Sequence, residues 1–133
     1  RRTDMSRTIS QEIKINASVG KIYAALSDPE IFSSFTHAKA NIDLSVGGAV
    51  SLFDGMITGV TVEAIQNTRL IQVWRAGNWS EGSYSLVRFD LDDDNPGATI
   101  PFEHTGFPAQ TKDHLEAGWY KMYWEPLKAY FES

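Results

Sequence analysis

Hydrophobic and polar positions alternate near the start of the chain. In "TISQEIKI", residues 8–15, Ile9 and Ile13 share one parity, which is the pattern of a β-strand with one buried face. The apolar residues that follow recur at helical spacing instead. Ser18 is a favourable N-cap residue, so we expect a short helix over residues 19–26.

A second helix start follows directly. Asp28 is a capping residue, and the ring of Pro29 already holds the backbone angle of a first helical turn. The spacing then turns Ile31 and Phe32 inward, and the helix is predicted to end near Phe35. The sequence therefore predicts one strand and two short helices before the main sheet.

The middle of the chain changes to short alternating runs rich in β-branched residues. Gly, Asn, Asp and Pro residues separate these runs, a rhythm that is typical of an antiparallel meander. Pro101 lies inside the last run, and its missing N–H predicts an edge position or a bulge there. The predicted strands cover residues 41–45, 49–53, 56–66, 69–76, 82–91 and 98–105.

The chain closes with a helical pattern from about Gln110 to Phe131. Pro126 removes one backbone hydrogen bond and is expected to bend the helix axis. Such an aromatic stripe is usually core, but Tyr120 and Trp124 lie far around the helix and are expected at the margin of the sheet. The apolar positions are Leu115, Trp119, Met122, Tyr123 and Tyr130 on one arc, and Tyr120, Trp124, Leu127 and Phe131 beside it.

This element order predicts an α+β fold in which a curved antiparallel sheet of about six to seven strands wraps around the long C-terminal helix. The sheet is the economical cover for so broad an apolar helix face, and such packing often leaves a cavity between the two. The 133 residues suit one domain. We expect a flexible N-terminal arm over residues 1–8 and a single domain over residues 9–133.

Composition narrows the function classes. The chain is 42% hydrophobic and 22% charged, as in ordinary globular proteins, and no apolar run approaches the ~20 residues of a membrane helix. It contains no cysteine, so disulfides and thiolate metal sites are excluded and a cytoplasmic location is expected. A formal net charge of −5 disfavours non-specific binding to nucleic acid.

The candidate chemistry is sparse. His37, His104 and His114 do not stand at zinc-ligand spacing, which predicts no metal site, and no cofactor motif is present. Serine residues occur, but none in a nucleophile elbow. Glu103 and His104 alternate along a strand and so face opposite sides of it, which makes a poor catalytic pair. We therefore expect no enzyme.

Several motifs in fixed order resemble one family. They are Asp28-Pro29-Glu30, "FTHA" at residues 35–38, Gly47-Gly48, Trp74-Arg75, "WSEG" at residues 79–82 and Gly118-Trp119. Over residues 11–131 the chain is similar to the C-terminal domain of the activator of Hsp90 ATPase, in the START-like, Bet v 1-like helix-grip superfamily. The resemblance implies the helix-grip fold and a co-chaperone domain with a role in the stress response.

The resemblance also implies a partner surface. "FTHA" and "GWYKMYWEPLK", from residue 118, are the stretches that look most like the eukaryotic co-chaperones. We expect both to meet Hsp90, and we assign partner binding to Phe35, Thr36, His37 and Lys39. The N-terminal domain of the full activators is absent from this sequence. The expected stimulation of the Hsp90 ATPase is accordingly small.

A second function class stays open beside the first. Many START-like proteins look like carriers of a small apolar ligand in the cavity between helix and sheet. A wide cavity favours the carrier, whereas an interior filled by Trp119, Tyr123 and Trp74 favours the interaction module. The residues expected to line the cavity are Trp74, Phe102, His104, Leu115, Trp119, Met122 and Tyr123.

Overall fold

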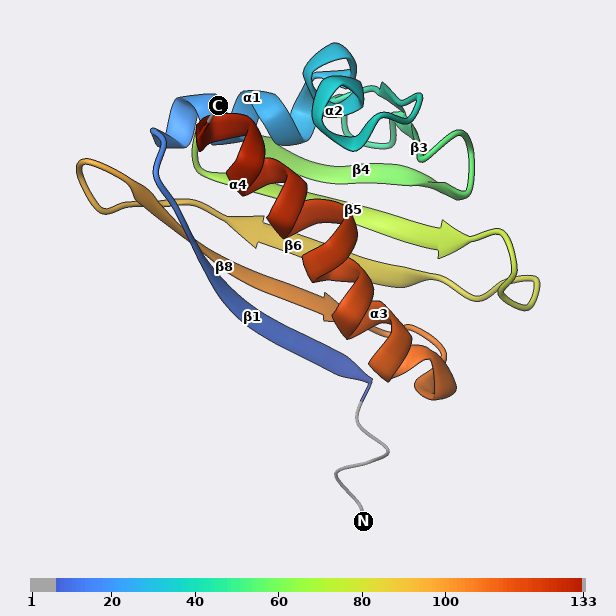
Figure 1. Cartoon of the computed structure of the whole chain (residues 1–133). Helices are drawn as coiled ribbons and strands as arrows, with labels where there is room; N and C mark the ends of the chain where they lie inside the picture. Colours follow the sequence, from blue (N-terminus) through green and yellow to red (C-terminus); the bar gives the residue numbers. More distant parts are fainter. Residues whose placement is uncertain (1–6, 133) are drawn as a thin grey trace.

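A computed structural model describes residues 7–132 of the chain. It has the predicted α+β architecture: a curved eight-stranded antiparallel sheet with a long helical segment lying across one face (Figure 1). The strand order is β1-β8-β6-β5-β4-β3-β2, and β7 pairs only with β8. The strands are β1 (Thr8–Ile15), β2 (Asn41–Ile42), β3 (Ala49–Leu52), β4 (Ile57–Ile65), β5 (Arg69–Ala76), β6 (Ser85–Asp90), β7 (Asp92–Asp93) and β8 (Ala98–Thr105).

Two short helices, α1 (Val19–Ser27) and α2 (Pro29–Thr36), cover one end of the sheet (Figure 1). Both begin where the capping residues predict. The Ser18 hydroxyl accepts a hydrogen bond from the Lys21 backbone N–H at 3.3 Å. The Asp28 carboxylate accepts one from the Glu30 N–H at 2.8 Å, which satisfies an orphan donor of the first turn of α2.

Pro101 is on an inner strand, so the edge position that its sequence allowed is wrong. It pairs with Glu12 of β1, on one side of β8. On the other side the β6 partners end at Phe102 and the β7 partners begin at Thr99. The proline therefore lies where the pairing on one side of β8 passes from one strand to another.

The C-terminal segment is not one regular α-helix. It runs through a 3₁₀ turn η2 (Ala109–Thr111), the helix α3 (Lys112–Gly118), a π-helical turn η3 (Trp119–Trp124) and the helix α4 (Glu125–Glu132). The Glu125 N–H bonds to the Tyr120 carbonyl, five residues back. Pro126 comes directly afterwards and has no N–H to donate to the α-helical ladder.

The π turn corrects two predicted orientations. Each π turn holds more residues than an α turn, so residues after Trp119 rotate relative to the α-helical phase. Trp124, expected at the margin, is fully buried, whereas Met122, expected in the interior, is 47% exposed. Tyr120 is 44% exposed, in line with the expected margin.

The beginning of the chain also differs from expectation. Residues 1–6 of the predicted flexible arm lie outside the described residues. Arg7 and Thr8, assigned to the same arm, are held in place: the Arg7 guanidinium donates hydrogen bonds to the carbonyls of Phe107 and Gly106, each at 2.7 Å. Thr8 is the first residue of β1 and pairs with Thr105 of β8. The arm therefore does not reach residue 8.

Candidate functional site

The space between helix and sheet is filled by aromatic rings. Trp119 of η3 lies 4.9 Å from the Trp74 ring, 4.3 Å from Phe102 and 4.5 Å from Tyr123, measured between ring centroids. Trp124 lies 5.2 Å from Phe102. Rings at these separations are in direct contact, so no room remains between them for a ligand.

A directed chain of hydrogen bonds runs through this aromatic interior. The Trp119 indole N–H donates to His104 Nδ1 at 3.0 Å, and His104 Nε2 lies 2.8 Å from Ser85 Oγ. Because an indole is only a donor, His104 Nδ1 must be the unprotonated nitrogen and Nε2 carries the proton. The Ser85 hydroxyl then donates to the Trp74 carbonyl at 3.2 Å.

Burial keeps His104 neutral. Its imidazole has no exposed surface, and desolvation lowers its pKa from 6.5 to about 3. An imidazolium would place a second donor against the Trp119 N–H, and that contact would be repulsive. His104 therefore holds the helix to β6 and β8 as a satisfied polar group, in the inward orientation that its strand parity predicts.

Two glutamines that the sequence analysis did not single out satisfy two other buried indoles. Gln72 accepts a hydrogen bond from the Trp74 indole at 2.8 Å, and Gln11 accepts one from Trp124 at 2.8 Å. Gln72 has the same parity along β5 as the buried Leu70 and Trp74, and that inward parity was the available signal. A buried polar side chain on the core face of a strand needs a partner.

The predicted cavity residues therefore divide. Trp74, Phe102, His104, Trp119 and Tyr123 come together, but as a packed core. Leu115 is half-buried beside this core, and Met122 faces outward. Four hollows on the surface of residues 7–132 lie elsewhere, and Trp74, His104 and Trp119 line none of these four.

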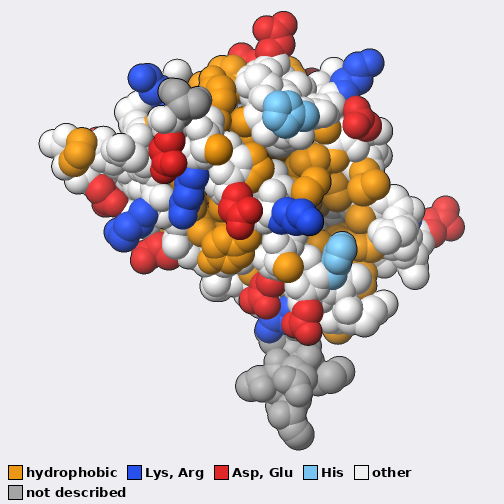
Figure 2. All heavy atoms as spheres, in the orientation of Figure 1, with side chains coloured by type: hydrophobic (Ala, Val, Ile, Leu, Met, Phe, Trp, Pro, Cys, Tyr) orange, Lys and Arg blue, Asp and Glu red, His pale blue; other side chains and the backbone are white. Residues whose placement is uncertain are grey.

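One of these hollows is an apolar groove between the end of α2 and the outer side of η3 and α4. We call it the α2–α4 groove. Its volume is about 410 Å³. Figure 2 shows hydrophobic side chains gathered on this face of the molecule, with basic, acidic and histidine side chains among them. The groove is lined by Ser34, Phe35, Thr36, His37, Lys121, Met122, Pro126, Ala129 and Tyr130.

The α2–α4 groove joins the two stretches that carry the co-chaperone resemblance. Phe35 is almost completely buried and forms the floor, with its ring 6.1 Å from Tyr130. His37 is exposed and ends α2 in the left-handed region, with φ 61°. Of the predicted partner residues, Phe35, Thr36 and His37 line the groove together with Met122, which had been assigned to the interior.

Lys39 is not among the groove residues. Its backbone N–H donates to the Asp54 carboxylate at 3.0 Å, and its carbonyl accepts from the Asp54 N–H at 3.0 Å. These bonds tie the segment after α2 to the β3–β4 turn. Lys39 is exposed and follows His37 by two residues, but it does not line the groove.

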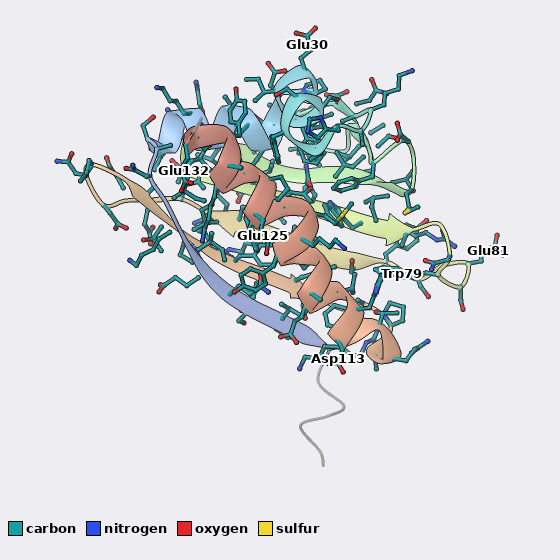
Figure 3. The ribbon with its side chains drawn as sticks, in the orientation of Figure 1. Glu30, Trp79, Glu81, Asp113, Glu125 and Glu132 are labelled. Carbon is teal, nitrogen blue, oxygen red and sulfur yellow. The ribbon has the colours of Figure 1, made fainter. Side chains whose placement is uncertain are left out.

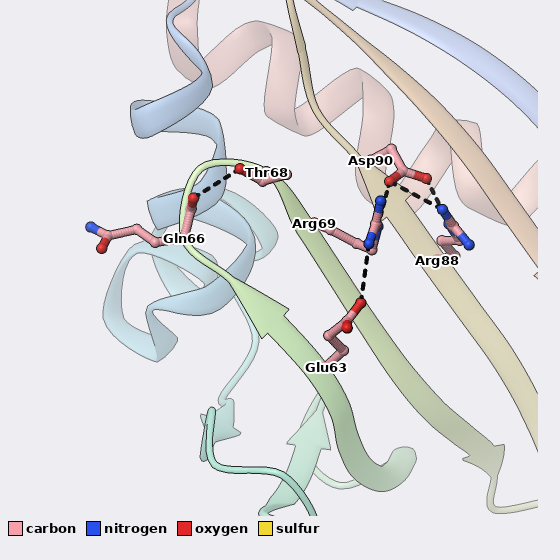
Figure 4. A network of polar contacts seen from close by, with 6 residues as sticks. All are labelled: Glu63, Gln66, Thr68, Arg69, Arg88 and Asp90. Carbon is pink, nitrogen blue, oxygen red and sulfur yellow. Dashed lines mark hydrogen bonds and ion pairs between the residues drawn. The ribbon is translucent and has the colours of Figure 1, made fainter.

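Other polar contacts join neighbouring strands of the sheet. On the outer sheet face Arg69 bridges Glu63 and Asp90, and Arg88 also pairs with Asp90 (Figure 4). Burial raises the pKa of Asp90, but hydrogen bonds from Arg88 and Arg69 outweigh it and lower the pKa overall.

On the β5–β6 hairpin, Glu81 lies at the outer tip while Trp79 lies nearer the helix and is buried (Figure 3).

Within residues 7–132, no group of three or more His, Asp or Glu side chains is close enough to hold a metal ion. Over the same residues no helix is both long and apolar enough to cross a membrane.

A family model for "Activator of Hsp90 ATPase homolog 1-like protein" matches residues 16–132. The chain belongs to this family. Among curated members, it is 26% identical over 111 residues to the activator of 90 kDa heat shock protein ATPase homolog 1 of Homo sapiens, which covers 84% of this chain and 33% of that protein. It is 28% identical over 118 residues to homolog 2 of Mus musculus, covering 88% of this chain and 35% of that protein.

Solved structures agree on the helix-grip fold. An HSP90 activator from Plasmodium falciparum superposes with a TM-score of 0.89 at 19% identity, covering 95% of this chain and 96% of that chain. A protein from Chromobacterium violaceum superposes with a TM-score of 0.80 at 20% identity, covering 96% and 98%. This family member spans about a third of the length of the curated relatives it matches.

Proposed function

We propose that this chain is a protein-interaction domain that binds Hsp90 through the α2–α4 groove. The observation that carries the proposal is the groove itself. It joins "FTHA" to the outer side of the C-terminal helix and exposes apolar side chains there, with Met122 47% and Tyr130 39% exposed. Exposed apolar and aromatic side chains in a hollow are typical of a protein-docking surface. The family and the names of its curated members supply the partner.

The packed interior favours this function over a ligand carrier. A carrier needs open volume next to inward polar groups, whereas here Trp119 contacts Trp74, Phe102 and Tyr123 directly. The inward polar groups already have partners, since His104 bonds to Trp119 and Ser85.

The proposed domain performs no chemistry of its own. Ser85 and His104 are hydrogen-bonded but lie buried in the core, away from solvent, and the low pKa of His104 makes it a weak base at neutral pH. Any change in the ATPase rate is then a change in Hsp90. We propose that the domain acts in the cytoplasm, together with Hsp90, as part of the stress response.

The expected affinity is modest. These 133 residues span about a third of the length of their curated relatives, and when they are tested by themselves no linked domain adds effective concentration, a gain worth a factor of about 10² to 10⁴. We expect weak binding and a small rise in ATPase rate.

The test is calorimetric titration of nucleotide-bound Hsp90 with the parent and with single variants. Met122→Ala should weaken binding about tenfold, as expected for an apolar contact at the centre of an interface. His37→Ala should weaken it less, and Lys39→Glu should act mainly through charge. Leu86→Ala is the matched control, because Leu86 is exposed on the opposite face of the sheet.

Three results are decisive in that titration. Loss of affinity in Met122→Ala with none in Leu86→Ala supports the groove. Equal binding by all variants leaves Hsp90 as the partner but removes the groove as the surface. Absence of binding at high micromolar concentration, together with tight retention of an extracted lipid, overturns the proposal in favour of the carrier.

A further inference from the structure

The charge of the α2–α4 groove is opposite to that of the whole chain. The chain carries 17 acidic and 12 basic residues, excluding histidine. Among the described residues that line the groove, Lys121 is the only Lys, Arg, Asp or Glu. The charged side chain in the lining of the groove is therefore basic although the chain is acidic overall, and a lysine at this position attracts a negatively charged partner.

Lys121 makes no direct ion pair with a carboxylate of residues 7–132. Lys14, Arg69 and Arg88 each lie within ion-pair distance of a carboxylate. No carboxylate of residues 7–132 lies that close to the Lys121 ammonium group, although the side chain is exposed. A partner can supply the missing counter-charge without displacing an internal one.

The backbone holds Lys121 beside the apolar part of the groove. Lys121 and Met122 are adjacent in η3, and the buried Trp119 and Tyr123 anchor the turn on either side of them. Across the groove, Phe35 and Tyr130 supply an aromatic wall with ring centroids 6.1 Å apart. An apolar side chain of a partner can therefore lie against Met122 while a neighbouring acidic group reaches Lys121.

The end of α2 gives the groove a direction. The backbone carbonyls at a helix C-terminus carry partial negative charge, which repels a carboxylate over the last turn. That turn ends at Thr36 and His37, on the side of the groove formed by α2. A carboxylate is thereby favoured at Lys121, on the side formed by η3.

We propose that the α2–α4 groove recognises a short peptide segment in which a large apolar residue neighbours one or more carboxylates. The apolar residue packs against Phe35, Met122 and Tyr130, and a carboxylate pairs with Lys121. This inference rests on the proposed function only in naming Hsp90 as the protein that carries the segment. The groove length from residue 121 to residue 130, about 14 Å at helical rise, accommodates roughly four extended residues.

The test uses two probes that differ only in charge: the acetylated, amidated tetrapeptides Leu-Leu-Asp-Asp and Leu-Leu-Lys-Lys. Each is titrated at low salt into the ¹⁵N-labelled chain and followed by NMR. The acidic peptide should shift backbone signals of residues 34–37 and 120–123, with an affinity about fivefold above that of the basic peptide, as expected for an exposed ion pair. Added salt should reduce the preference.

Two charge reversals make the assignment specific. Lys121→Glu should remove or reverse the preference for the acidic peptide. Lys128→Glu makes the same change of charge on the same helical segment, but Lys128 lies in a different hollow, beside Phe131, and this variant should keep the preference. Equal binding of both peptides, shifts outside the groove, or loss of the preference only in Lys128→Glu would each overturn the inference.

The outcomes separate this inference from the proposed function. If Hsp90 binds at the groove but the tetrapeptides show no charge preference, the peptide chemistry is wrong and the Hsp90 assignment stands. If the acidic peptide is preferred and Lys121→Glu abolishes that preference while Hsp90 does not bind, the groove recognises acidic peptides and the chaperone assignment is wrong.

Discussion

The π turn η3 has an inner side and an outer side that differ in nearly every property. Trp119, Tyr123 and Trp124 point into the sheet and are almost completely buried. Between them, Tyr120 and Met122 are roughly half exposed and face solvent. The inner side is closed by ring contacts and satisfied hydrogen bonds, whereas the outer side borders an open apolar groove.

The difference shows how one aromatic-rich turn can serve both packing and recognition. In a regular α-helix Trp119 and Tyr123 would share a face, but Trp124 would lie to the side of it. The π turn brings Trp124 onto the inner face and leaves Tyr120, Lys121 and Met122 as a continuous outer surface. Single π turns of this kind are frequent at functional sites.

The largest expected difference between the two sides of η3 is in how much an alanine substitution on each side changes stability. Trp119→Ala should lower the free energy of unfolding by ~3 to 5 kcal/mol, because it leaves a cavity and removes the donor to His104. Met122→Ala, on the outer side, should change it by less than about 0.5 kcal/mol. Urea denaturation of both variants provides the measurement, and coincident midpoints for Trp119→Ala and the parent would place Trp119 outside the core.

A smaller loss of stability is expected from a substitution in the sheet that packs against the inner side of η3. Gly59 of β4 is opposite Trp74 of β5, and a Cβ atom on Gly59 would overlap the Val73 carbonyl oxygen. Gly59→Ala should therefore destabilise the fold by about 1 to 3 kcal/mol.

Gly118→Ala is the control for the Gly59 substitution. A Cβ atom on Gly118 meets no atom within 4 Å apart from its chain neighbours and the backbone of its own helix, so this change should stabilise the helix by about 0.5 to 1 kcal/mol. Thermal melting of both variants distinguishes the crowded sheet from the open helix. Stabilisation by both changes would contradict the close approach of β4 and β5.

A pH effect of about 2 kcal/mol should come from His104. The unfolded chain binds a proton at this residue below pH 6.5, whereas the folded chain resists protonation down to about pH 3. The contribution of His104 to the free energy of unfolding is therefore fully present above pH 6.5 and is lost progressively as the pH is lowered towards 3. Between pH 7.5 and pH 5 the expected loss is about 2 kcal/mol.

Urea denaturation at the two pH values measures that loss. His104→Gln should remove most of the difference between the two pH values, even though it lowers stability at both. His114→Gln changes an exposed histidine and should retain the difference. An unchanged pH dependence in His104→Gln would mean that another group is responsible.

Much of the fold could be predicted because local signals agree with tertiary structure. The strands at residues 8–15, 69–76 and 98–105 have the predicted bounds, since alternation and turn residues both define them. The strand expected at 41–45 shortens to Asn41–Ile42. Asp43 accepts a hydrogen bond from the Ser45 N–H at 2.9 Å, and this local turn competes with strand pairing.

The candidate site could be predicted only in part. The resemblance linked "FTHA" to the stretch from residue 118 that contains Met122, but the regular helical phase assigned the Met122 side chain to the interior and not to the groove. The reason is that the π turn depends on packing of Trp124 against the sheet and its bond to Gln11, more than a hundred positions away in sequence. No periodicity rule for a regular helix contains that contact.

The filled interior could not be derived from the sequence for a similar reason. Whether a helix and a curved sheet enclose a cavity depends on the sum of side-chain volumes and on how far the sheet curves. Trp74, Trp119 and Tyr123 were the residues whose packing would decide between carrier and interaction module. Their contacts follow from the curvature of β4 and β5 and from the helix phase together.

The most direct test of this account is methyl NMR of the chain with nucleotide-bound Hsp90. The central claim is that the outer side of η3 meets the partner while the inner side stays packed. We predict that Hsp90 shifts or broadens the Met122 methyl signal and leaves the Leu86 methyl signals, on the opposite sheet face, and the Trp119 indole signal unchanged. Perturbation of Leu86 without Met122, or a change at the Trp119 indole, would contradict it.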